Sequence, residues 1–361
     1  MKNINYPAPK QEYKVLVRCF TFNHSKYIED ALNGFAMQQT NFPFVCLVMD
    51  DASTDGEQDV IKAWMERECD MSRVETIDIP TSVVIIVPHK INASCIFAFY
   101  LMKQNLYKAK EEKMRHVTPW REKCEYEALC EGDDYWIDPL KLQKQVDWME
   151  LHTEYSMCWH DAYVDENGVQ TQYNRYKTDC DVPFVDLVVK GGDLCPTASL
   201  FYRLTCFFDY TNKVKENDLS FYVGDYPLQM YMGYVGKVRY MFQPMSVYRF
   251  LSSGSWSQNV KLLSIDDKVK LCDKEHQLLK NMNILTDYKY EHLFKQCWYL
   301  YAFRFNCVEK LYEEACRYYD LLDESFQRGI SFKYRLVGLG YPNLAGFIIN
   351  IISLKNKVFS K

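Results

Sequence analysis

Two short apolar runs in the first half of the chain each end in a cluster of acidic residues. FVCLVM precedes Asp50 and Asp51, and YEALC precedes the EGDD sequence at 131–134. Short apolar runs that end in turn signals are typical of buried strands. The carboxyl ends of parallel strands line the crevice in which open α/β sheets bind ligands. The two clusters therefore predict one acidic crevice, whose carboxylates repel unless a cation or bound donors offset them, and this indicates a metal–nucleotide site.

Strand and helix patterns alternate through the first half. Strands are expected at 14–20, 44–49, 82–88, 126–130 and 156–164. Helices are expected at 24–39, from the Ser53–Asp55 turn to about 68, at 93–108 and from Pro139 to 152. Thr54 and Glu57 match a capping box for the second helix. Alternation of this kind predicts βαβ units and an α/β fold with a mostly parallel sheet flanked by helices.

The second half has a mixed pattern and then becomes helical. A helix is expected after Pro227 and a strand near 237–243, and three helical patterns follow from about residue 261. We therefore predict a catalytic domain over 1–260 and a helical C-terminal region over 261–361. The charge-rich segment 107–125 interrupts the alternation. A solvated excursion of helix and loop is the expectation there, and a contact surface for an acceptor or partner is the alternative.

Composition excludes several classes of protein. The formal net charge of −5 disfavours a general nucleic-acid binder. The 14 cysteines form no CxxC pair and many of them sit in apolar runs, which indicates reduced, buried thiols in a cytoplasmic protein. The stretch LAGFIINIISL (344–354) is shorter than the ~20 residues that span a bilayer. With Lys355 and Lys357 it forms either a core helix or a peripheral contact with the inner face of a membrane.

The acidic residues suit two kinds of chemistry. Asp133 and Asp134 follow a glycine, and their oxygens are the hard ligands that Mg²⁺ and Mn²⁺ prefer. Asp50 and Asp51 end the second strand, where a carboxylate can accept hydrogen bonds from a base or ribose; turn formation and capping explain part of the same sequence. His160 and Asp161 are adjacent in an expected strand, so their side chains point to opposite faces and do not support a hydrolase triad.

Three stretches together resemble a known family. VLVRCFTFNHSKYIEDALNGFAMQQ, FVCLVMDDASTDG and ALCEGDDYWIDPLKLQKQVDWM are similar, in order and spacing, to the nucleotide-sugar-binding half of family 2 glycosyltransferases with the GT-A fold. The resemblance spans about residues 14–165 and continues more weakly through PTASLFYR, VGDYPLQMYMG and YRFLSSGSWS. It implies an enzyme with a Rossmann-like GT-A domain that takes a nucleotide-sugar donor.

The resemblance also implies roles for the residues near the donor base. Phe20, Phe22 and Asn23 match the loop that lines the nucleobase pocket, and Asp51 matches the aspartate that binds the base. Many relatives carry a proline where this chain has Phe20. His89, Lys90 and Asn92 occupy the region where relatives often place a basic contact, and no role is assigned to them.

The same resemblance implies roles around the diphosphate. Asp133 and Asp134 match the DXD motif, Asp133 contacting the ribose side of the nucleotide and Asp134 holding Mg²⁺ or Mn²⁺ on the diphosphate. Asp225 matches the general base that deprotonates the acceptor. Arg249 and Trp256 are each either a contact to the diphosphate or acceptor or a structural residue at a strand edge. Leu251 stands where many relatives have histidine.

The function that follows is an inverting transfer from a UDP- or dTDP-sugar to a saccharide or lipid-linked saccharide. Surface-polysaccharide synthesis at the inner membrane face is the setting that the resemblance implies. A sugar nucleotidyltransferase is disfavoured because FTFNHSKY lacks a Gly-rich basic loop. A catalytically silent nucleotide- or carbohydrate-binding module is the remaining alternative.

Overall fold

The computed structural model describes residues 6–250, 260 and 262–342, and these residues form two compact units. The first unit runs to Lys213 and resumes at Leu228 for the last part of the sheet. The second unit contains Val214–Pro227 and the described residues from Val260 onward. The chain thus enters the second unit briefly before returning to the first.

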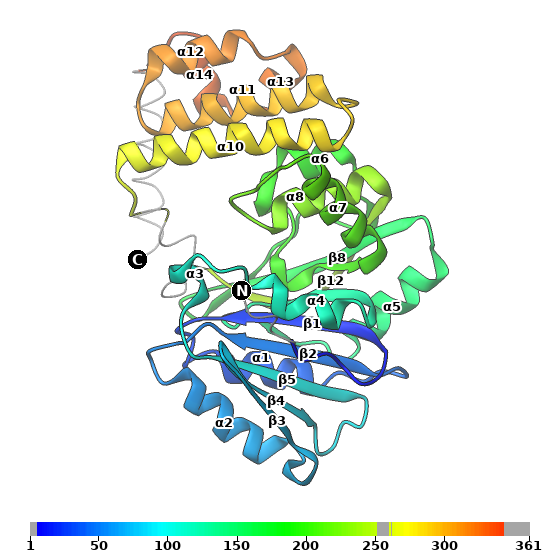
Figure 1. The fold of residues 1–361 in the computed structure, drawn as a ribbon. Helices are drawn as coiled ribbons and strands as arrows, with labels where there is room; N and C mark the ends of the chain where they lie inside the picture. Colours follow the sequence, from blue (N-terminus) through cyan, green and yellow to red (C-terminus); the bar gives the residue numbers. More distant parts are fainter. Residues whose placement is uncertain (1–5, 251–259, 261, 343–361) are drawn as a thin grey trace. The chain divides into compact units, whose positions relative to one another are not determined.

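Four parallel strands form the centre of the sheet in the first unit, in the order β6–β1–β2–β5. Their bounds are β1 Tyr13–Thr21, β2 Phe44–Asp50, β5 Cys95–Met102 and β6 Cys124–Leu129. Figure 1 shows β1, β2 and β5 side by side. The strands expected at 14–20, 44–49 and 126–130 are therefore confirmed, and so is the mostly parallel centre of the sheet.

Antiparallel pairings extend the sheet on both sides. Beyond β5 lies a hairpin of β4 Ser82–Pro88 and β3 Glu75–Ile79. Beyond β6 the order continues with β11 Phe201–Arg203, β8 Tyr155–Glu166, β12 Lys237–Arg249 and β10 Cys180–Asp181. The short strands β7 Tyr135–Trp136 and β9 Val169–Gln172 pair with β12 and β8. β8 and β12 are parallel, so the complete sheet is mixed.

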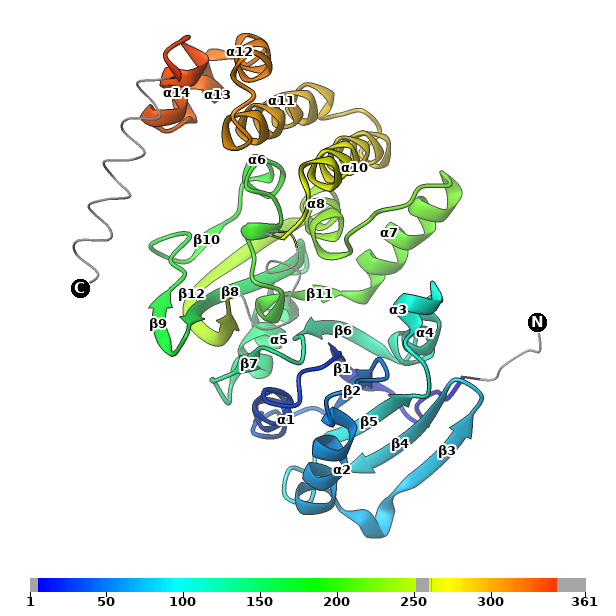
Figure 2. The same cartoon turned by 90° about the vertical axis from the view of Figure 1, so that its left-hand side faces the viewer.

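Helices cover both faces of the central strands. One face packs against α1 Ile28–Ala36, α2 Glu57–Glu68 and α5 Lys141–Leu151. The other face packs against α3 Leu106–Ala109 and α4 Met114–Arg121. Figure 2 shows α1 and α2 on one side of the sheet and α3 and α4 on the other. The remaining helices are α6 Phe184–Val189, α7 Leu204–Glu216, α8 Asp225–Val235 and the 3₁₀ turns Met71–Arg73, Gly191–Asp193 and Thr197–Ser199.

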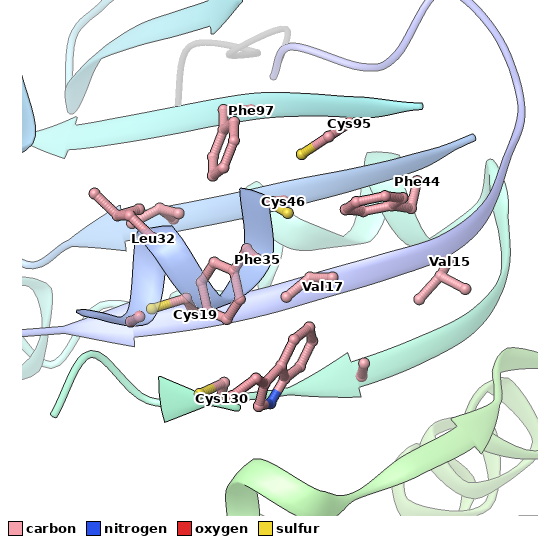
Figure 3. Packing of buried hydrophobic residues seen from close by; sticks show 14 of the residues in the cluster. Val15, Val17, Cys19, Leu32, Phe35, Phe44, Cys46, Cys95, Phe97 and Cys130 are labelled. Atoms are coloured by element: carbon pink, nitrogen blue, oxygen red, sulfur yellow. The ribbon is translucent and has the colours of Figure 1, made fainter. Parts of the chain in front are cut away.

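Burial on both faces explains the apolar strands. Every position of β2 is buried, as expected for a central parallel strand. Figure 3 shows Leu32 and Phe35 of α1 beside strand residues such as Val17 and Cys46. All the cysteines, which lie in the described part of the chain, are free thiols and most are buried.

The helix expected at 93–108 is wrong. The structure has β5 at Cys95–Met102, paired in parallel with β2, and only the short α3 within the rest of the segment. CIFAFYLM is apolar at every position, so it lacks the periodicity that separates a helix from a fully buried strand. The segment forms a strand because it pairs with both β2 and β4, which flank it in the sheet.

The second unit is helical, as the C-terminal pattern predicted. Its helices are α10 Ile265–Leu285, α11 Glu291–Val308, α12 Tyr312–Asp320, α13 Glu324–Gly329 and α14 Phe332–Gly338. Leu278 and Met282 of α10 and Phe303 of α11 are among its buried residues. None of the helices in the described ranges has the length and apolar character needed to cross a bilayer. The stretch 344–357, with its membrane question, and Leu251 and Trp256 lie outside the described residues.

Candidate functional site

The carboxyl ends of β1, β2 and β6 meet at one edge of the sheet. Thr21 pairs with Asp50 in the register of β1 and β2. The pairing continues past the strands: Asp51 N–H donates to the Thr21 carbonyl at 3.0 Å, and Gly132 N–H donates to the Phe20 carbonyl at 3.0 Å. The loops that follow the three strands therefore lie side by side, and the two acidic clusters share one edge as predicted.

Glu57 ties the first two loops together. Its carboxylate accepts hydrogen bonds from the Thr21 hydroxyl, from His24 N–H at 2.9 Å and from the Ser53 hydroxyl at 2.8 Å. Burial raises the pKa of Glu57, although these three donors lower it in part. The capping box predicted from Thr54 and Glu57 is wrong, because α2 begins at Glu57 itself and its side chain turns inward.

Asn23 is part of the same loop framework. It has a left-handed backbone with φ of 60°, which asparagine tolerates better than most residues. Its side-chain oxygen accepts from Thr54 N–H at 2.8 Å, and its own N–H donates to Ser53 Oγ at 2.8 Å. Asn23 therefore shapes the loop, and its place in a nucleobase pocket remains a prediction.

Asp51 is buried and already has three donors. Leu106 N–H lies 2.7 Å from Oδ1, Tyr107 N–H lies 3.4 Å from Oδ2, and the Lys113 ammonium lies 2.9 Å from Oδ2. The same ammonium is 5.7 Å from the centre of the Phe20 ring. A ligand that uses Asp51 as an acceptor thus meets a carboxylate oriented by the segment that follows β5.

The phenylalanines predicted for the base pocket lie near cations. Phe20 has the Arg18 guanidinium 4.5 Å from its ring centre, and Phe22 has the Lys108 ammonium at 5.8 Å. An aromatic ring between cationic groups and a carboxylate offers both a stacking face and polar partners to a flat heterocycle. The nucleobase pocket at Phe20 and Phe22 stays a prediction.

The segment 107–125 is less solvated than expected. α4 buries Val117 and Trp120 against the sheet, and Arg121 forms a buried ion pair with Glu127 at 2.6 Å. Lys113 precedes α4 and, like Glu57, takes part in the site in a way that the sequence pattern does not indicate. The apolar spacing of Val117 and Trp120 was the available signal, but the many charges around it obscured the pattern.

The second acidic cluster forms a tight turn after β6. Gly132 lies so close to β1 that a Cβ there would be 2.1 Å from Thr21 Oγ1. The absence of a side chain at Gly132 thus allows the turn to pack closely against the end of β1. Asp133 Oδ2 lies 3.9 Å from His24 Nε2, and Asp134 is buried behind it.

Arg249 holds this acidic turn in place. Arg249 N–H donates to Asp134 Oδ1 at 2.9 Å, and its Nη1 donates to the Asp133 carbonyl at 2.8 Å. The other terminal nitrogen pairs with Asp30, and the guanidinium lies 4.4 Å from the centre of the Tyr135 ring. These contacts give Arg249 a positioning role at the end of β12; a nucleotide-sugar contact remains a prediction.

A bound cation would offset the cost of ionising the buried Asp134. Burial raises the pKa of Asp134 well above its usual range, and the Asp133 charge adds to this, while the Arg249 N–H opposes it. The described part of the chain has no group of three His, Cys, Asp or Glu side chains suited to hold a metal. Mg²⁺ typically takes one or two carboxylates and completes its shell with diphosphate oxygens and water. The two aspartates fit the protein share of that kind of site.

The remaining residues considered from the sequence belong to other elements. Asp225 is the first residue of α8 and belongs to the second unit, where its Oδ1 accepts from Tyr226 N–H at 2.8 Å. His160 and Asp161 form no triad: His160 Nδ1 lies 2.7 Å from the Asp161 carbonyl, and the Asp161 carboxylate accepts from Gln172 and Asn174.

Known structures share this architecture. S. aureus TarS residues 1–349, in complex with UDP, superimposes with a TM-score of 0.51 at 14% identity, covering 92% of this chain and 87% of that one. The longer S. aureus TarS structure gives a TM-score of 0.54 at 15% identity, with 92% and 53% covered. The chain has a GT-A-type glycosyltransferase fold. At these identities the likeness establishes the fold and not the chemistry of the site.

The sequence relatives that match this chain are named as uncharacterized proteins. No family model matches the chain. Uncharacterized proteins of Mycobacterium tuberculosis (strain H37Rv) and Mycobacterium bovis are 29% identical over 238 residues, which is 65% of this chain. The match spans 58% of the length of these relatives, so it concerns only part of each protein.

Proposed function

We propose that the chain transfers a sugar from a nucleoside-diphosphate donor to a saccharide or lipid-linked saccharide, with inversion at the anomeric carbon. One observation carries the proposal. Asp51 and the Asp133–Asp134 pair, which the sequence predicts to share one crevice, follow β2 and β6, the two strands that flank β1, at one edge of a GT-A-type sheet. The related fold of TarS was solved with UDP.

The first part of the proposal concerns the nucleoside. Asp51 accepts an N–H of the base, and Phe20 and Phe22 supply apolar faces beside it. Uracil, thymine and guanine each carry a ring N–H that can donate to a carboxylate. UDP- and dTDP-sugars remain the first candidates because of the family resemblance.

The second part concerns the diphosphate. Asp133 and Asp134 would hold Mg²⁺ or Mn²⁺ there, and Asp133 would also lie toward the ribose. A divalent ion at this place supplies positive charge that stabilises the departing diphosphate. Arg249 keeps both aspartates in position through the contacts described above.

The third part concerns the transfer step. The acceptor hydroxyl oxygen forms a bond to the anomeric carbon while the bond from that carbon to the diphosphate oxygen breaks. Asp225 takes the hydroxyl proton, and the electron pair of the broken bond leaves with the nucleoside diphosphate. A base of this kind contributes ~10²–10⁴-fold to the rate. Surface-polysaccharide synthesis on the inner face of a membrane is the setting that we propose for this reaction.

Thermal unfolding with UDP, dTDP, GDP and CDP, each with Mn²⁺ or with EDTA, tests the donor site. A ligand that binds the folded state raises its stability, by about 2.7 kcal/mol at 100 times Kd. We expect a metal-dependent shift with one nucleotide class. Asp134→Ala should abolish the metal-dependent part, whereas Asp59→Ala, at an exposed position of α2, should leave it intact. A shift that is identical in EDTA would contradict the metal assignment.

Turnover of the matching nucleotide sugar tests the transfer step. Asp225→Asn should keep nucleotide binding and reduce release of nucleoside diphosphate by about 10²-fold or more. If the wild-type protein binds the nucleotide but shows no turnover with any acceptor fraction, the silent binding module is the better description. If Asp225→Asn turns over normally, another group is the base.

A further inference from the structure

We propose that α10 of the second unit is part of the catalytic apparatus, because it anchors the loop that carries Asp225. Tyr222 and Glu275 are the main positioning pair, and Asn281 is a second anchor. The inference rests on the proposed role of Asp225. It assigns a function to helices that the sequence pattern leaves without one.

Two hydrogen bonds connect the loop to α10. The Tyr222 hydroxyl donates to Glu275 Oε2 at 2.6 Å, and Asn281 Nδ2 donates to the Ser220 carbonyl at 2.9 Å. Glu275 and Asn281 lie six positions apart on α10, and their partners lie two residues apart in the loop. Both contacts are formed within the second unit, to which Asp225 also belongs.

Burial makes the Tyr222–Glu275 contact specific. Glu275 is 7% exposed, and burial raises its pKa, while the hydrogen bond from Tyr222 lowers it in part. A buried carboxyl group that loses its donor suffers an uncompensated desolvation cost, so the tyrosine hydroxyl has a strongly preferred place. The loop position three residues before Asp225 is thereby fixed to the helix.

A third contact holds the chain on the other side of Asp225. Tyr226 is 4% exposed. Burial, and then the neighbouring Cys297 of α11 and Glu275 of α10, raise the pKa of Tyr226 well above its usual range. The candidate base thus lies between Tyr222, which is hydrogen-bonded to Glu275, and the buried Tyr226. Its backbone cannot shift without disturbing a buried cluster.

The anchor should therefore affect kcat without affecting nucleotide binding, and kinetics can detect this difference. Displacing a reacting group by about 1 Å can cost ~10²-fold in rate. Disturbing the anchor should therefore reduce kcat, while the nucleotide contacts of Asp51 and the Asp133–Asp134 pair, all in the first unit, should remain. A residue that only stabilises the second unit would not produce that separation.

The experiment compares Tyr222→Phe, Glu275→Leu and Glu275→Gln in the full chain, with Tyr318→Phe as control. Tyr318 is a half-buried tyrosine of α12 in the same unit, whose hydroxyl makes no hydrogen bond within the described residues. The probes are nucleotide binding with Mn²⁺, release of nucleoside diphosphate from the matching nucleotide sugar, and hydrogen exchange of the amides at 219–226. Glu275→Gln keeps an acceptor for Tyr222 and serves as the conservative rescue.

We expect Tyr222→Phe and Glu275→Leu to reduce kcat by about 10- to 10²-fold, with nucleotide Kd within twofold and faster exchange at 219–226. Glu275→Gln should retain at least a third of the wild-type kcat, and Tyr318→Phe should match the wild type. If Asp225→Asn is inactive but Tyr222→Phe and Glu275→Leu keep full kcat, the anchoring inference is wrong and the proposed base stands. If Asp225→Asn is fully active, the proposed base is wrong, and the inference that α10 serves catalysis through Asp225 is wrong with it.

Discussion

At the scale of single residues, Lys141 is the strongest departure from ordinary burial. It has no exposed surface, its ammonium nitrogen lies 3.9 Å from the centre of the Trp136 ring, and it donates to Gln145 Oε1 at 2.7 Å. Burial lowers the pKa of Lys141 to about 7, although nearby Cys130 and Cys158 act in the opposite direction. The folded state therefore disfavours the protonated form of Lys141.

This gives a prediction about pH. In the unfolded chain a lysine has a pKa near ~10.4, so between about pH 7 and 10 the unfolded state binds more protons than the folded state. The contribution of Lys141 to stability should therefore rise with pH through that window, and its full penalty should remain below it. Lys141→Met should therefore be more stable than the wild type by about 2–4 kcal/mol at pH 6, and the difference should shrink toward pH 9.5. Urea unfolding at three pH values measures this.

The exposed Lys62 of α2 supplies the control, because Lys62→Met removes an amine without a buried site. It should leave the pH dependence of stability unchanged. A stability difference between Lys141→Met and the wild type that stays the same from pH 6 to 9.5 would mean that Lys141 stays protonated with an ordinary pKa.

Arg249 carries a second prediction at this scale. A lysine keeps the charge but lacks the planar fork that reaches Asp30 and the Asp133 carbonyl together. Losing a hydrogen bond to a charged group costs about 1.5–3 kcal/mol, so Arg249→Lys should weaken metal-dependent nucleotide binding by about 10-fold. Titration of the nucleotide in Mn²⁺ measures the change. Arg239→Lys, on the same strand but paired with Asp179 and Asp181, should bind normally; equal losses in both variants would point to a general effect on β12.

At the scale of elements, the packing of one turn against another decides the geometry of the site. The turn after β6 touches the end of β1 at Gly132, and Glu57 of α2 gathers the donors of the loops after β1 and β2. The site is therefore built from three loops that share contacts. A substitution in one loop should therefore change the positions of residues in the other two.

Gly132→Ala tests this coupling. The added methyl group would meet Thr21 Oγ1 at 2.1 Å and Thr21 Cβ at 2.5 Å, and overpacking of this kind costs about 1–3 kcal/mol. We expect a lower melting temperature and weaker nucleotide binding, both measured by thermal unfolding. Gly329→Ala, where a Cβ would meet no atom within 4 Å, should melt like the wild type or higher. A Gly132→Ala protein with unchanged stability would show that the turn moves freely.

At the scale of the whole molecule, the division into two units separates the two parts of the proposed reaction. The acidic edge belongs to the first unit, and Asp225 with its anchor belongs to the second. The segment Val214–Pro227 links them in sequence, since the chain leaves the first unit there and re-enters it within α8. The second unit is thus more than a C-terminal addition.

Hydrogen exchange with and without UDP and Mn²⁺ tests the assignment of binding to the first unit. Ligand that binds only the folded state slows exchange where it blocks opening. Protection should increase in peptides covering 20–25, 51–55 and 131–134, and should stay unchanged in α12 and α14. Protection confined to the C-terminal helices would place the nucleotide in the second unit and contradict the proposed site.

Comparison of sequence and structure shows where local patterns are sufficient. The strands at β1, β2 and β6 were predictable because each has a short apolar run that ends in polar turn residues. The capping box at Thr54 and the helix at 93–108 were not, because both depend on distant partners. Glu57 turns inward toward Thr21, which lies 36 residues away, and β5 is a strand because β2 and β4 flank it.

The sequence by itself determined the α/β class, the helical C-terminal region and the acidic residues after β2 and β6, because periodicity and turn chemistry are local properties of the chain. Only the tertiary structure decided that Lys113 contacts Asp51, that Arg249 holds the acidic turn, and that Asp225 belongs to the helical unit. These contacts join residues that are far apart in the sequence. Long-range pairing depends on which buried polar groups find partners in the folded chain, and no local pattern records that choice.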